Sequence, residues 1–112
     1  MSHEELPVFE RWSRFLGWLL STTEKFPRRV RFTFSSRLDN LALDVLEKLV
    51  EAAYSRNKAE HLRRANLDIE KIRVLMRLCH DQKYVSTRAY EHAVRELYEV
   101  GRMLGGWLKQ QP

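Results

Sequence analysis

Apolar residues recur at alternating spacings of three and four along most of this chain, and this period constrains the fold more than any other feature. In residues 58–82 the alternation is strict. Such spacing places apolar side chains on one face of an α-helix, where they pack against other helices. Glycine and proline, which interrupt helices, number only 4 and 3 among 112 residues. The period therefore predicts an all-α fold.

Four segments carry this period, and we expect each to form one helix. They are residues 8–25, 27–56, 58–82 and 87–109, the last preceded by Ser86, a residue type that caps helix N-termini. The residues expected to face the core are Val8, Trp12, Phe15 and Leu19; Phe34, Leu38, Leu41, Val45, Leu49 and Ala52; Leu62, Ala65, Ile69, Ile72, Met76 and Cys79; and Tyr90, Val94, Leu97, Gly101, Leu104 and Leu108. Short connections predict an up-down-up-down four-helix bundle, and the length suits one domain, residues 1–112.

Two details of the second and fourth segments need separate interpretation. Residues 31–34 alternate like a strand, but four residues with no partner strand do not make a sheet, so we expect them to be helical. Gly101 and Gly105 lie within the fourth segment. We interpret both as small residues that let a neighbouring helix approach closely.

The second and third segments carry more apolar residues than one bundle buries. Phe32, Leu43, Val50 and Tyr54 in the second, and Leu67, Val74 and Leu78 in the third, fall opposite the expected core positions. Single apolar residues are common on protein surfaces, and that alternative stays open. Their alignment on two helices instead indicates a contact between copies of the chain. The expected oligomer interface comprises Leu43, Val50, Tyr54, Leu67, Val74 and Leu78.

Arginine gives the chain its charge. Lys and Arg number 20 against 15 Asp and Glu, a net charge of +5, which favours an acidic partner such as nucleic acid. The arginines that we expect to bind nucleic acid or a partner are Arg63, Arg64, Arg73, Arg77, Arg88, Arg95 and Arg102. Arg28, Arg29 and Arg31 form a further cluster. The alternative is a solvated helix face with ion pairs such as Glu91–Arg95 and Arg95–Glu99.

No pattern typical of an enzyme is present, so we expect no catalytic residues, no metal and no cofactor. His61, His80 and His92 have no zinc-ligand spacing with Cys79, which we expect to be a buried, inert thiol. A single cysteine agrees with a reducing compartment. The start of the chain does not resemble a signal peptide, and no apolar stretch approaches the roughly 20 residues that span a bilayer. We therefore expect a cytoplasmic protein without membrane contact.

Segments spread over nearly the whole chain carry a family resemblance. They are residues 12–20, 23–28, 41–47, 73–78, 90–92 and 101–107. Their order and spacing resemble those of the accessory variability determinant (Avd) proteins of diversity-generating retroelements. Those proteins are similar in fold to the four-helix proteins encoded within bacterial ribosomal RNA intervening sequences.

The resemblance implies a homopentameric barrel of four-helix bundles with a basic surface. It also implies binding to the reverse transcriptase of the element and to its template RNA, in a complex that makes mutagenised cDNA. The accessory protein is implied to be non-catalytic, and Arg73 and Arg77 lie in a family-like arginine-rich stretch. The alternative is a protein of the ribosomal intervening-sequence type that acts as a generic oligomeric scaffold for protein or RNA.

Overall fold

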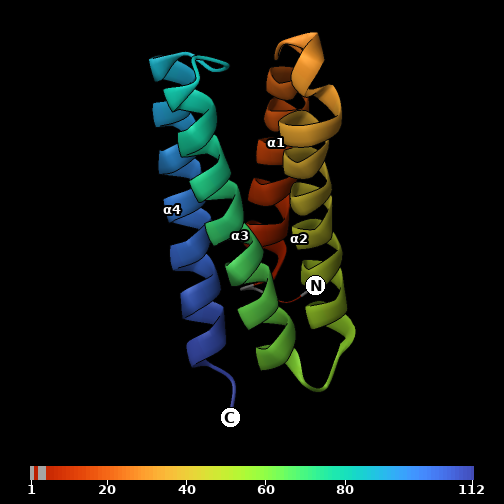
Figure 1. Cartoon of the computed structure of the whole chain (residues 1–112). Helices are drawn as coiled ribbons and strands as arrows, with labels where there is room; N and C mark the ends of the chain where they lie inside the picture. The colour runs from red at the N-terminus through yellow and green to blue at the C-terminus, as the bar shows by residue number, and fades with distance from the viewer. Residues whose placement is uncertain (1, 3–4) are drawn as a thin grey trace.

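The computed structural model describes residue 2 and residues 5–112, which contain four α-helices and no strand (Figure 1). The elements are α1 (Glu5–Thr23), the 3₁₀-helix η1 (Arg28–Val30), the π-helix η2 (Arg31–Ser35), α2 (Ser36–Tyr54), α3 (Lys58–Asp81) and α4 (Thr87–Lys109). The prediction of an all-α chain with four main helices is confirmed, and α3 and α4 lie within one residue of their predicted bounds.

The helices form an elongated bundle of 44 × 24 × 19 Å. α1 packs against α2 and α4, and α3 packs against the same two helices. Each helix runs opposite to the one before it, as Figure 1 shows. None of the helices in the described part of the chain is long and apolar enough to cross a lipid bilayer.

The core contains the apolar residues that the period selects in α1, α2 and α3, with one exception at Phe34, which is half-buried. Trp12 is fully buried, and its indole N–H donates a hydrogen bond to the carbonyl of Ala42 at 2.9 Å. This bond joins α1 to α2 and satisfies the polar atom that the buried ring brings into the core. Cys79 is also fully buried, as predicted.

The predicted core face of α4 is only partly right, because Leu97 and Leu104 are buried and the other four predicted residues are not. Its buried residues are Ala93, Leu97, Val100, Leu104 and Trp107, whereas Tyr90, Val94, Gly101 and Leu108 are only half-buried. The predicted and the observed core faces share Leu97 and Leu104. The three-four period alone therefore does not determine whether the residues on one side of these leucines or those on the other side face the core. Turning Val100 and Trp107 inward removes more apolar area from water than turning Gly101 and Leu108 inward.

The expected close approach at the glycines of α4 is wrong. A Cβ atom built on Gly105 would meet nothing within 4 Å, and one on Gly101 would lie 3.8 Å from the side-chain oxygen of Asn66. The second distance is an ordinary van der Waals contact, so helix packing requires glycine at neither position.

The second segment does not begin as one continuous α-helix from Pro27. Pro27 precedes η1, and η1 leads directly into η2. The backbone N–H of Ser36 donates to the carbonyl of Arg31, five residues earlier, which is the hydrogen bond of a π-helix. Residues 31–34 are therefore helical, as predicted, but the wider turn leaves Phe32 88 % exposed and Phe34 half-buried.

Local hydrogen bonds fix the helix ends. Ser2 and Glu5 exchange side-chain-to-backbone hydrogen bonds, a capping arrangement that starts α1 three residues earlier than predicted. The Ser86 hydroxyl accepts from the N–H of Ala89 at 3.1 Å, which confirms Ser86 as the cap of α4. After α3, Lys83 has a positive φ of 65°, and the N–H of Tyr84 donates to the carbonyl of Cys79. This left-handed residue ends α3 and turns the chain into α4.

Candidate nucleic-acid interface

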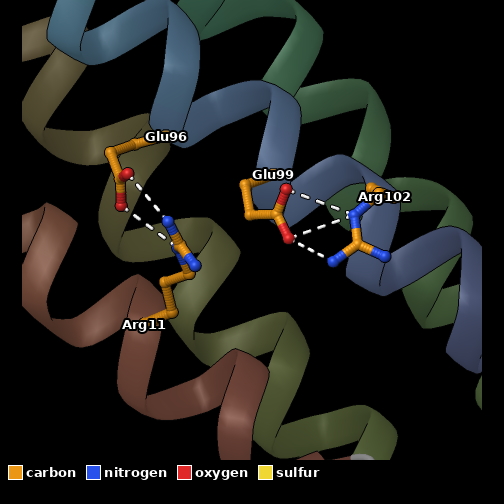
Figure 2. Close-up of polar contacts among 4 residues, drawn as sticks. All are labelled: Arg11, Glu96, Glu99 and Arg102. Carbon is orange, nitrogen blue, oxygen red and sulfur yellow. Dashed lines mark hydrogen bonds and ion pairs between the residues drawn. The ribbon is translucent and has the colours of Figure 1, made fainter.

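The seven arginines predicted to bind nucleic acid are all exposed, and ion pairing divides them into two groups. Four pair with a glutamate of their own helix: Arg63 and Arg64 with Glu60, Arg73 with Glu70, and Arg102 with Glu99. Arg77, Arg88 and Arg95 form no ion pair within the described part of the chain. Among the described residues, neither pair of the alternative interpretation, Glu91–Arg95 or Arg95–Glu99, forms, and Glu99 pairs with Arg102 instead (Figure 2).

Arg88 and Arg95 line a cleft of about 410 Å³ between α1 and α4, called here the α1–α4 cleft. Its other lining residues are Trp18, Ser86, Ala89 and His92. Trp18 and His92 are half-buried, and their ring centroids lie 4.6 Å apart. The lining residues include two guanidinium groups and no carboxylate, so the cleft is suited to an anion.

Arg11 neutralises one of the two acids that directly adjoin lining residues of this cleft in the sequence, Glu96. Its guanidinium donates two hydrogen bonds to the carboxylate of Glu96, at 3.2 and 2.9 Å, across the contact between α1 and α4 (Figure 2). These hydrogen bonds hold the pKa of Glu96 below its ordinary value and raise the pKa of Arg11. Glu96 follows Arg95 directly, so its pairing with Arg11 reduces the repulsion of an anion bound at Arg95.

Arg73 and Arg102 line a different cleft, of about 480 Å³, between α3 and α4, called here the α3–α4 cleft. Tyr98, which is 71 % exposed, also lines it. Both arginines are held by acids, and hydrogen bonds from Arg102 lower the pKa of Glu99. This cleft therefore offers an anion less uncompensated positive charge than the α1–α4 cleft does.

Residues 24–37, called here the basic segment, concentrate the net charge of the chain. They contain five basic residues and one acid, a net charge of +4, whereas the other 98 residues sum to +1. The basic residues are Lys25, Arg28, Arg29, Arg31 and Arg37, and none forms an ion pair within the residues that the structure describes. Arg29 lies over the ring of Tyr84, 5.4 Å from its centroid. The sequence shows this cluster, but our prediction of the binding residues did not include it.

The remaining residues with potentially reactive or metal-binding side chains include Cys79 and His80. Burial raises the pKa of the Cys79 thiol to about 11, which keeps it protonated and unreactive near neutral pH. His80 stacks on Tyr90 with ring centroids 4.6 Å apart, and its Nε2 lies 3.0 Å from the Thr87 hydroxyl. Among the described residues, no group of three or more His, Cys, Asp or Glu side chains is placed to hold a metal ion.

The six residues of the predicted oligomer interface are all exposed, as their positions in the sequence predict. The exposed fractions are 40 % for Leu43, 38 % for Val50, 84 % for Tyr54, 56 % for Leu67, 55 % for Val74 and 44 % for Leu78. Their exposure is confirmed, and their contact with another copy stays a prediction. The same sequence reasoning missed Leu6, Leu20 and Tyr98, which are also exposed.

Comparison with known proteins agrees with the resemblance found in the sequence. The model of a family described as bAvd-like matches residues 7–111, nearly the whole chain. No curated protein matches the sequence. The matched region includes α2, α3, α4, the basic segment and both arginine-lined clefts. The chain therefore belongs to the bAvd-like family of accessory variability determinant proteins.

Proposed function

We propose that this protein is a non-catalytic accessory protein of a diversity-generating retroelement, where it binds the reverse transcriptase and the template RNA and supports mutagenic cDNA synthesis. The family match over residues 7–111 is the observation that carries the proposal. Both macromolecules that it binds belong to the same reaction, so the accessory protein acts by bringing them together.

The distribution of cations supports the RNA part of the proposal. Arg88 and Arg95 line the α1–α4 cleft without an acidic partner in the described part of the chain, and the basic segment adds a net charge of +4. Guanidinium groups bind phosphate oxygens in a forked geometry. Contacts to phosphate position the nucleic acid without reading its bases, so we expect affinity to depend more on salt than on RNA sequence.

Assembly into a homopentameric barrel is part of the same proposal. The exposed apolar residues of α2 and α3 supply the contact between subunits. A contact between two different faces closes into a ring when the rotation allows it. A ring repeats the basic segment and the α1–α4 cleft once per subunit, which multiplies the number of phosphate contacts.

Co-purification tests the proposal directly. The reverse transcriptase of the same retroelement carries an affinity tag and is expressed with this protein and the template RNA. We expect this protein and the RNA to elute together with the enzyme at moderate salt. Elution of the enzyme free of this protein, in the presence of the RNA, would contradict the proposed function.

A further inference from the structure

A third cleft, of about 600 Å³, opens at the end of the bundle where α1 ends and α2 begins, called here the end cleft. Arg28, Arg31 and Phe32 line it together with Leu20, Asp39 and Asn40. Phe32 is 88 % exposed, more than any other large apolar residue of the described chain. An almost fully exposed aromatic ring beside two arginines suits a ligand that supplies both a flat apolar face and negative charge.

Within the basic segment, the 3₁₀-helix η1 is followed by the π-helix η2, and the side chains of the segment contact two different parts of the molecule. Phe26 and Phe34 pack on Tyr84 with ring centroids 6.2 and 5.8 Å apart, and Arg29 lies over the same ring. These residues tie the segment to the connection between α3 and α4. Arg28, Arg31 and Phe32 line the end cleft on the side of α1 and α2, and Phe26 contributes to both sides, because it also lines this cleft. Along the π-turn of η2, Phe32 is exposed, whereas Phe34, two residues later, is half-buried.

The charges around the end cleft favour an anion. Neither Arg28 nor Arg31 forms an ion pair within the described residues. Two acids also line the cleft, Glu24 and Asp39. Asp39 accepts a hydrogen bond from the Thr23 hydroxyl at 2.7 Å, and burial raises the pKa of its carboxyl, which disfavours the charged form. Asp39, the more buried of the two acids, therefore opposes an incoming phosphate less than an exposed carboxylate would.

We propose that the end cleft binds single-stranded RNA, with one base stacked on Phe32 and the adjoining phosphates on Arg28 and Arg31. The inference rests on the proposed function. It adds that the bound RNA is single-stranded and that Phe32, Arg28 and Arg31 are the residues that bind it. In a duplex the faces of the bases are already stacked, so only a single strand offers a free face to the ring. A second copy of the chain is a poorer occupant, because its net charge of +5 is repelled by a cleft that already contains two arginines.

Fluorescence anisotropy with a labelled oligouridine of about 12 nucleotides tests the proposal against an RNA duplex of equal length. Phe32→Ala should weaken binding of the single strand by about 5- to 150-fold and leave binding of the duplex unchanged. Phe32→Trp should retain the affinity of the parent for the single strand, because indole also stacks. Arg28→Gln combined with Arg31→Gln should weaken binding of both RNAs.

Two variants serve as matched controls. Tyr98→Ala removes another exposed ring between two arginines, but Arg73 and Arg102 there are paired with acids, so single-strand affinity should not change. Arg29→Gln removes one charge from the same segment, but Arg29 lies on Tyr84 and does not line the end cleft, so its effect should be smaller than that of Arg28→Gln.

The outcomes separate this inference from the proposed function. If the parent protein binds neither RNA, the proposed function fails. If the parent binds RNA but Phe32→Ala matches it, or loses single strand and duplex equally, the end cleft is not a stacking site and only this inference fails. It also fails if Phe32→Ala lowers the mass of the assembly while RNA affinity per subunit is retained, because Phe32 then belongs to a subunit contact.

Discussion

Arg88 and Arg95 differ from Arg73 and Arg102 in what lies beside them. The first two line a cleft with Trp18 and His92 and have no acidic partner among the described residues. The other two are each bound to a glutamate on the same helix. A guanidinium already held by a carboxylate gains less from a phosphate, because it must first give up that carboxylate. The unpaired arginines should therefore dominate the salt dependence of RNA binding.

Replacing Arg88 and Arg95 tests this distinction. Arg88→Gln with Arg95→Gln should weaken RNA binding and reduce the slope of log affinity against log salt by roughly 1.4, about 0.7 for each single-strand phosphate that the variant no longer neutralises. Glu99→Gln with Arg102→Gln is the control, because it alters the same helix without changing the net charge. RNA titrations at several salt concentrations measure both slopes. Equal slopes for the two double variants would show that Arg88 and Arg95 are only solvated.

The exposure of the candidate arginines follows from the sequence, but their pairing does not. Glu99 has Arg95 four residues before it and Arg102 three residues after it, and both spacings permit an ion pair. In the folded chain Glu99 pairs with Arg102, which leaves Arg95 available to the α1–α4 cleft. Trp18 joins Arg95 in this cleft only because α1 packs on α4. No local pattern in the sequence predicts that α1 contacts α4.

At the scale of the helices, the contact between α1 and α4 includes a polar interaction that the apolar period cannot predict. Arg11 and Glu96 are 85 positions apart, and both are partly buried. The hydrogen bonds from Arg11 hold the pKa of Glu96 below its ordinary value of 4.5. A carboxyl with a lowered pKa adds stability above the pKa of the unfolded chain, and this stability is lost as the pH falls through the folded pKa.

Glu96→Gln should therefore change the pH dependence of stability as well as its size. At pH 7 we expect the variant to unfold with a free energy about 1 kcal/mol below that of the parent. The difference should shrink as the pH falls below 4.5, because the parent then loses its carboxylate. Urea denaturation between neutral and acid pH measures this, and Glu99→Gln, at an exposed pair within α4, should have a smaller effect. A difference independent of pH would mean that Arg11–Glu96 acts only through packing.

At the scale of the whole molecule, the exposed apolar residues of α2 and α3 remain uncovered when the bundle core is complete. Leu67 and Val74 are 56 % and 55 % exposed, although the core of the same helix is fully packed. One bundle cannot bury both faces of α3, so a second copy is the simplest way to remove this apolar area from water. The bundle thus stabilises the subunit, and the outer face is available for assembly.

Leu67→Glu with Val74→Glu should dissociate the oligomer without unfolding the subunit. Light scattering should give a mass well above 13.4 kDa for the parent and close to 13.4 kDa for the double variant. Helicity by circular dichroism should be retained, because both side chains lie outside the core. Tyr98→Glu places one such charge at an exposed aromatic residue of α4 and should leave the mass unchanged. A parent protein that is itself monomeric would contradict the proposed barrel.

The sequence by itself determined the helical class, the core of α1 to α3, the Ser86 cap and the exposure of the outer apolar residues. Each of these features depends only on residues close together in the sequence. The three-four period sets the helical class, the core and the outer face, and a single local hydrogen bond sets the cap. Tertiary structure alone decided the buried face of α4, the π-turn that exposes Phe32 and the clefts that contain Arg28, Arg31, Arg88 and Arg95. In these places local alternatives are nearly equal in energy, and packing between distant segments selects one of them.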